Sequence, residues 1–146
     1  SEISLVELAR ATFDERCIGE TVAALIAAEQ ARATTDKSIA LALDRISEEE
    51  TRHAAFAWRV VRWALGVGGA PIARAIEQRF ECAVAELAPT SEPQPAIDLE
   101  IALAYGRLPA SEHAKIRAEA LREVVAPCLR SLLGGQDRVD SPVHAA

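Results

Sequence analysis

Two long segments without proline, on either side of a three-residue break, constrain the fold more than any other feature of the chain. The first extends from about residue 3 to about residue 33, and the second from about residue 37 to about residue 65. Apolar residues recur in steps of three and four along both, which predicts amphipathic α-helices. In the break "TTD", Thr35 or Asp36 can accept hydrogen bonds from the free amides of the following turn and so cap the second helix.

Two helices of about 30 residues are each about 45 Å long, at 1.5 Å per residue. Joined by a tight turn, they form an antiparallel hairpin, which is half of an up-and-down four-helix bundle. Such a hairpin leaves part of its apolar surface uncovered unless two further helices pack against it. We therefore predict an all-α fold in which residues 1–66 form a helical hairpin, covered either by the C-terminal helices or by a partner hairpin.

Glycine and proline mark the end of the second long helix. The stretch "GVGGAP" follows Leu65, and Gly66 is the expected left-handed C-cap. Pro71 is suited to the first position of the next helix, which we expect to continue to about residue 87.

Shorter helices are expected in the rest of the chain. A loop rich in proline is predicted at residues 88–95, followed by a short helix and by a last helix that Ser111 caps and Pro127 breaks or bends. We expect residues 67–133 to form an additional helical region and residues 134–146 a flexible tail.

The composition narrows the class of protein. The formal charge of −6 leaves no basic surface for nucleic acid and disfavours binding to anionic membranes. Three widely spaced cysteines without a C-x-x-C motif predict neither a disulfide framework nor a zinc ribbon, and a reducing cytoplasm is the simplest setting for them. The chain has no methionine and opens on "SEISLVELARATF", already helical in pattern, so we expect it to begin inside a longer protein.

The predicted hairpin brings three residues with metal-binding side chains together. Glu20 lies on the apolar stripe of the first helix, while Glu50 and His53 lie on that of the second. Glu20 is about 14 residues before the turn and Glu50 about 15 after it, so antiparallel packing places them at nearly the same height. Two carboxylates in an apolar interior repel each other, and we find no lysine or arginine on either stripe. A metal ion resolves this, and oxygen and imidazole ligands without thiolate suit iron or manganese, with zinc as an alternative.

Two other interpretations of the same residues stay open. Glu15, five residues before Glu20, also has apolar neighbours and is the rival ligand on the first helix. Glu50 and His53 can instead form an ordinary pair on a helix surface, supported by their spacing of three. Cys17 lies one turn before Glu20, where we expect a small buried apolar side chain rather than a ligand.

The segment from "ERCIGETVAAL" to "EEETRHAAFAWRVVRWAL" resembles the second half of the ferritin-like di-iron carboxylate superfamily. In that fold, two helices each supply a Glu and two others each supply Glu-x-x-His. The resemblance implies a ferritin-like four-helix bundle in which Glu20, Glu50 and His53 bind metal, and it implies a supporting position beside the ligands for Glu49. The sequence departs from the family because it contains no second Glu-x-x-His on an equivalent helix. The resemblance therefore implies that a homodimer, or a separate N-terminal half, completes the bundle.

Two functions are compatible with this pattern. The resemblance implies a di-iron oxidoreductase or ferroxidase, with iron as cofactor and manganese or zinc as alternatives. The other function is a non-catalytic helical interaction module that binds no metal. Residues 67–146 match no motif that favours either function.

Overall fold

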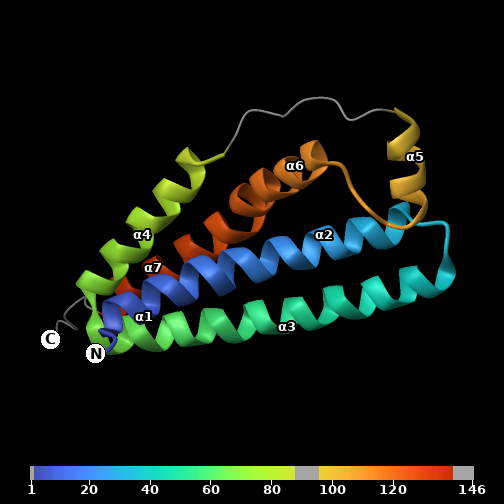
Figure 1. The fold of residues 1–146 in the computed structure, drawn as a ribbon. Helices are drawn as coiled ribbons and strands as arrows, with labels where there is room; N and C mark the ends of the chain where they lie inside the picture. Colours follow the sequence, from blue (N-terminus) through green and yellow to red (C-terminus); the bar gives the residue numbers. More distant parts are fainter. Residues whose placement is uncertain (1, 88–95, 140–146) are drawn as a thin grey trace, which may run out of the picture.

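The computed structural model of the chain describes residues 2–87 and 96–139, and every regular element in these two ranges is helical. This confirms the all-α fold class. The helices form two layers, a long antiparallel hairpin and a set of shorter helices that pack on one face of it (Figure 1).

The first long helix is one continuous rod built from three segments. These are α1 (Leu5–Ala11), a π-helical segment η1 (Thr12–Ile18) and α2 (Gly19–Ala33). Ser4 caps its start, because the Ser4 hydroxyl accepts from the Glu7 amide while the Glu7 carboxylate accepts from the Ser4 amide. The sequence predicted this rod within two residues, but as an uninterrupted α-helix.

The second long helix, α3 (Lys37–Gly68), runs antiparallel to α2 (Figure 1). Asp36 is its N-cap, since the Asp36 carboxylate accepts from the amides of Ser38 and Ile39 at 2.8 and 3.0 Å. The hairpin turn is fixed from outside by α5 (Ala96–Ala104), whose Ala104 carbonyl accepts from the Thr34 hydroxyl at 2.8 Å. These bonds fix the turn about which the two long helices fold.

The second layer is formed by α4 (Ala70–Ala85), α6 (Ala110–Ala120), η2 (Leu121–Val125) and α7 (Ala126–Val139). Helix α4 packs against α1, while α6, η2 and α7 lie along α2, η1 and the C-terminal part of α3 (Figure 1). The Arg79 side chain donates to the Asp14 carboxylate at 2.8 Å and so ties α4 to η1.

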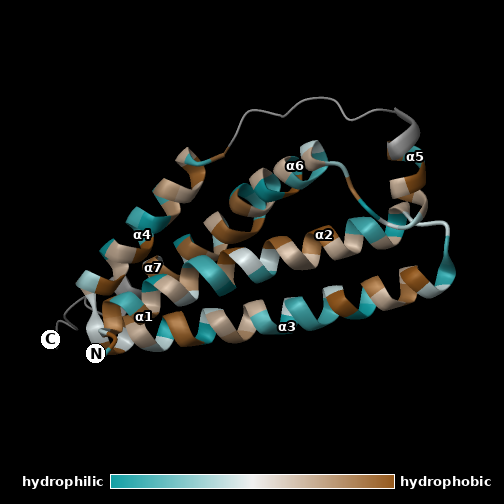
Figure 2. Ribbon diagram, viewed as in Figure 1, coloured by the Kyte–Doolittle hydropathy of each residue, from teal (hydrophilic) through white to brown (hydrophobic). Residues whose placement is uncertain are grey.

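The core lies between the hairpin and this second layer. Its largest fully buried side chains come from both layers: Phe13, Ile18, Val61, Leu65, Ile72, Ile76, Leu121 and Val125. Trp58 packs edge-on against Phe13, with ring centroids 5.9 Å apart. Figure 2 shows brown, apolar residues on the helices of both layers. The C-terminal helices therefore bury their apolar side chains against one face of the hairpin.

The end of α3 differs from the sequence prediction. Gly66 is helical and is not the C-cap; the helix continues to Gly68, and Gly69 has the positive φ of 63°. A Cβ on Gly68 would meet the Ile72 side chain at 2.5 Å, so a larger residue there would force that side chain to move. Pro71 lies in the first turn of α4, as expected.

The C-terminal helices correct the predicted cap, and of the break or bend predicted at Pro127 they rule out the break. Pro109, not Ser111, is the N-cap of α6, and the chain stays helical through Pro127. A proline at this position cannot donate to the carbonyl of residue 123 and would crowd it. The π-helical segment η2 widens the helix just before Pro127, with the Ala126 amide donating to the Leu121 carbonyl, so the chain turns past the proline without a break.

The remaining boundaries follow from the described ranges. Helix α7 continues to Val139, beyond the start that we predicted for a flexible tail at residue 134. The loop predicted at 88–95 and the last residues, 140–146, lie outside the described residues. Among the helices described, none combines the length and the apolar character that a membrane crossing requires.

Candidate metal centre

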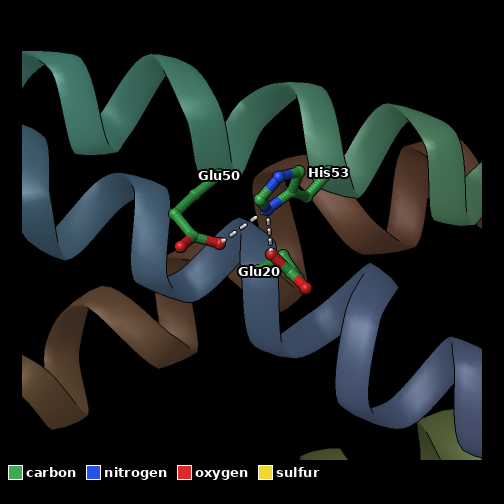
Figure 3. A group of neighbouring side chains, drawn as sticks. All are labelled: Glu20, Glu50 and His53. Atoms are coloured by element: carbon green, nitrogen blue, oxygen red, sulfur yellow. Dashed lines mark hydrogen bonds and ion pairs between the residues drawn. The ribbon is translucent and has the colours of Figure 1, made fainter.

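The hairpin brings Glu20, Glu50 and His53 together (Figure 3). The Nδ1 atom of His53 lies 3.1 Å from Glu20 Oε2 and 3.6 Å from Glu50 Oε2. One ligand atom from each residue lies within 4.8 Å of the other two. The convergence predicted from the spacing about the turn is therefore present.

The register of the hairpin places the group at half height. Glu20 lies near the middle of the rod from Leu5 to Ala33, and Glu50 and His53 lie near the middle of α3. The Ser47 hydroxyl donates to the Ala24 carbonyl at 2.8 Å, one turn from the group. This bond between the two helices holds the register that brings Glu20 and Glu50 to the same level.

A π-helical segment directly precedes Glu20. The Gly19 amide donates to the Asp14 carbonyl, five residues earlier, and so closes a wider turn than an α-helix has. The buried Thr21 hydroxyl donates to the Cys17 carbonyl at 2.6 Å in the same region. Wide turns of this kind occur frequently at functional sites, because they change where the following side chains point. The sequence pattern did not indicate this segment.

The group lies at the surface and not in an apolar interior, which corrects the sequence prediction. The side chains of Glu20, Glu50 and His53 are 12%, 27% and 57% exposed. The stripe that α3 buries passes through Ala54, Ala57 and Val61, to one side of His53. More than half of the His53 side chain is exposed, so the group opens to solvent.

An arginine also contacts the group, although it does not lie on either predicted stripe. Arg16 Nη1 donates to Glu20 Oε1 at 2.8 Å. Arg16 lies four residues before Glu20, a spacing at which side chains on one helix meet. That spacing was visible in the sequence, whereas the prediction considered only residues on the apolar stripe. The charge of Glu20 is therefore partly neutralised by the protein itself.

The two carboxyl groups titrate as a pair. A hydrogen bond with Glu20 raises the pKa of Glu50, and partial burial and the negative charge of Glu20 act in the same direction. The pKa of Glu20 is lowered, first by the hydrogen bond from Glu50 and then by Arg16 and His53. As pH rises, the Glu20 carboxyl therefore loses its proton before the Glu50 carboxyl does.

The other candidates lie outside the group. Glu15 and Glu49 are both exposed, and the three-residue group within the described ranges includes neither of them. Among the described residues, the hydrogen bonds and ion pairs of Glu20, Glu50 and His53 join them to one another and to Arg16. The supporting position implied for Glu49 stays a prediction. Cys17 is fully buried, and burial raises the pKa of its thiol to about 12, consistent with the expected apolar role.

The donor set fits a single divalent cation. Oxygen and nitrogen ligands lie about 2.0–2.2 Å from such an ion, which puts pairs of ligand atoms roughly 3–4 Å apart. The separations of 3.1 and 3.6 Å between His53 and the two carboxylates lie in this range. One imidazole and two carboxylates, without thiolate, are the ligands expected for iron, manganese or zinc. Because the three side chains would approach such an ion from one side, the other coordination positions would be filled by other donors.

Comparison of the chain with protein-family models, with curated proteins and with solved structures gives no match. The interpretation of the site therefore depends on its own geometry and chemistry.

Proposed function

We propose that the chain is a ferritin-like metal-binding protein in which Glu20, Glu50 and His53 bind a divalent metal ion. The observation that carries the proposal is the approach of three ligand atoms, from two different helices, to within 4.8 Å of one another. Two carboxylates at this distance repel unless a proton or a cation lies between them. A metal ion satisfies both carboxylates and the imidazole at once.

Iron or manganese is the metal that the proposal favours, with zinc as the alternative. Bound iron would supply redox chemistry towards oxygen, as in a di-iron oxidoreductase or a ferroxidase, provided that further ligands from another half or from a symmetric partner hold a second ion. The protein's own contribution is to hold three ligands at half height of the hairpin. Arg16 would keep Glu20 ionised before the metal binds, and it would then compete with the metal for the same carboxylate.

A second candidate function is a non-catalytic helical interaction module that binds no metal. Two observations favour it: Arg16 already partners Glu20, and aromatic side chains on α3 are exposed. In this case Glu20, Glu50 and His53 form a polar group within a docking surface. The two functions differ in metal content, which can be measured directly.

Elemental analysis of the purified protein, after expression with ample iron and manganese, separates the two functions. We expect the wild type to retain metal, and Glu50→Ala and His53→Ala to lose most of it. Glu48→Ala is a matched control, because Glu48 is an exposed glutamate on the same helix outside the group.

A wild type without metal, both as purified and after dialysis against Fe(II), Mn(II) or Zn(II), would favour the interaction module. Equal metal content in the wild type and in both ligand variants would show that the metal is bound elsewhere. Circular dichroism of each variant controls for loss of the fold.

A further inference from the structure

Helix α3 carries an apolar stripe that the described part of the chain leaves uncovered. We define the open stripe as the residues that follow a repeat of three and four along α3: Ile39, Ala42, Ile46, Glu49, His53, Phe56, Val60, Trp63 and Val67. Ile46, Phe56, Trp63 and Val67 are 45%, 62%, 56% and 63% exposed. A strict repeat of three and four is the pattern of a helix that packs lengthwise against another helix.

The open stripe and the candidate metal centre share one face. His53 is part of the stripe and is also the most exposed of the three ligands. In the second layer, α6, η2 and α7 contact α2, η1 and α3 respectively, but they leave Phe56, Trp63 and Val67 exposed. Apolar side chains that recur along the whole helix are therefore exposed directly beside an open ligand group.

The stripe is self-complementary about its midpoint. A two-fold axis perpendicular to α3, between His53 and Phe56, pairs stripe residues whose numbers add up to 109. Ile46 would then lie opposite Trp63 of a second copy, and Ala42 opposite Val67. His53 would lie next to the axis, opposite Phe56. Because the site is at half height of both long helices, the two hairpins overlap along their full length.

The surface is also large enough. Helix α3 has 32 residues. A hairpin of this length offers a face of about 45 by 20 Å, or about 900 Å² per partner. Specific and stable interfaces bury about 800 Å² per partner.

We propose that a second copy of this chain docks on the open stripe, with α3 antiparallel to its counterpart, and brings a second set of Glu20, Glu50 and His53 across the axis. This inference rests on the proposed function, because the role of the dimer would be to supply four carboxylates and two imidazoles for a pair of metal ions. Covering the stripe also shields the group from water, which strengthens its attraction for cations.

Sedimentation equilibrium tests the docking surface separately from the metal. We expect the wild type to have twice the chain mass of 15.6 kDa. Phe56→Glu and Val67→Glu each place a charge in the stripe, and we expect each to weaken the dimer by at least about 100-fold. Val84→Glu is the matched control, because Val84 is a 43% exposed apolar residue on α4, and we expect it to remain dimeric.

Metal content is measured on the same samples, and circular dichroism checks that each variant is folded. A wild type that is monomeric at every soluble concentration overturns the second copy, even if it binds metal, and the proposed function then stands without it. A dimer that both stripe variants retain shows that the interface lies elsewhere and also overturns the proposal. A dimer that the stripe variants dissociate and that contains no metal supports the docking surface and contradicts the proposed function.

Discussion

Replacing Glu50 by glutamine is expected to stabilise the metal-free protein at neutral and alkaline pH. The amide of the new glutamine would still donate to Glu20, as the protonated carboxyl does, but carries no charge. At 4.8 Å, the upper limit of the separations within the group, two unit charges repel by about 1 kcal/mol in water and by about 3 kcal/mol at an effective dielectric constant of about 20. Because Arg16 already neutralises part of the charge on Glu20, we expect the substitution to raise the free energy of unfolding by about 1–2 kcal/mol.

The difference must depend on pH in a defined direction. The pKa of Glu50 is raised in the folded protein, so its stabilising contribution is fully present below the unfolded-state pKa and is lost as pH rises through the folded-state pKa. Wild type and Glu50→Gln are therefore expected to be equally stable in acid and to diverge above the ordinary glutamate range. Urea unfolding in the presence of a chelator, at several values between about pH 4 and pH 8, measures the difference.

Metal is expected to reverse the order of stability. Binding to the folded state alone stabilises a protein by about 2.7 kcal/mol at a free concentration about 100 times the dissociation constant, and only the wild type retains the full ligand set. Glu48→Gln is the matched control, and we expect it to leave both stability and metal response unchanged. The reasoning is refuted if Glu50→Gln is less stable than the wild type at about pH 8 without metal, or if Glu50→Gln and the wild type respond equally to metal.

Three further predictions concern single residues. Arg16→Gln removes a cation that competes for Glu20, and since an exposed ion pair contributes up to about 1 kcal/mol, we expect up to about fivefold tighter Mn(II) binding by calorimetry. Gly66→Ala should stabilise the helix by up to about 1 kcal/mol, because no atom lies close to where the new Cβ would be. Gly69 has a positive φ, so Gly69→Ala should lower the free energy of unfolding in urea by about 1–3 kcal/mol. The Cys17 thiol, buried and with its pKa raised to about 12, should react with an alkylating reagent only after unfolding.

The hairpin and the convergence of the ligands could be predicted because both follow from local rules. The apolar repeat and the absence of proline predict two long helices, and the Asp36 cap fixes where the second begins. Once the turn is placed, counting residues from it sets the heights of Glu20 and Glu50. Long-range packing is needed only to keep the two helices antiparallel.

Burial of the site could not be predicted in this way. Which side of α3 is covered depends on where α6 and α7 pack, and these helices are more than 40 residues away in sequence. The apolar residues of α3 cover a broad arc of the helix surface and form two stripes. One stripe passes through Ala57 and Val61, and the other through Phe56 and Val60. Periodicity alone merges them into a single buried face. The π-helical segment before Glu20 is equally invisible, because its residues favour no wide turn in isolation.

The exposure of the site changes the physical reason for expecting a metal. A carboxylate pair in an apolar interior would require a cation in the monomer, whereas a pair that is 12% and 27% exposed can be satisfied by water, a shared proton and Arg16. The requirement would return if a second copy covered the open stripe, because the same charges would then lose their water. Together, the two proposals predict that metal binding and dimerisation are coupled. By linkage, the factor by which metal strengthens the dimer equals the factor by which dimerisation strengthens metal binding. A dimer association constant that is identical with and without bound metal would therefore show that the two proposals for this face of the hairpin are independent of each other.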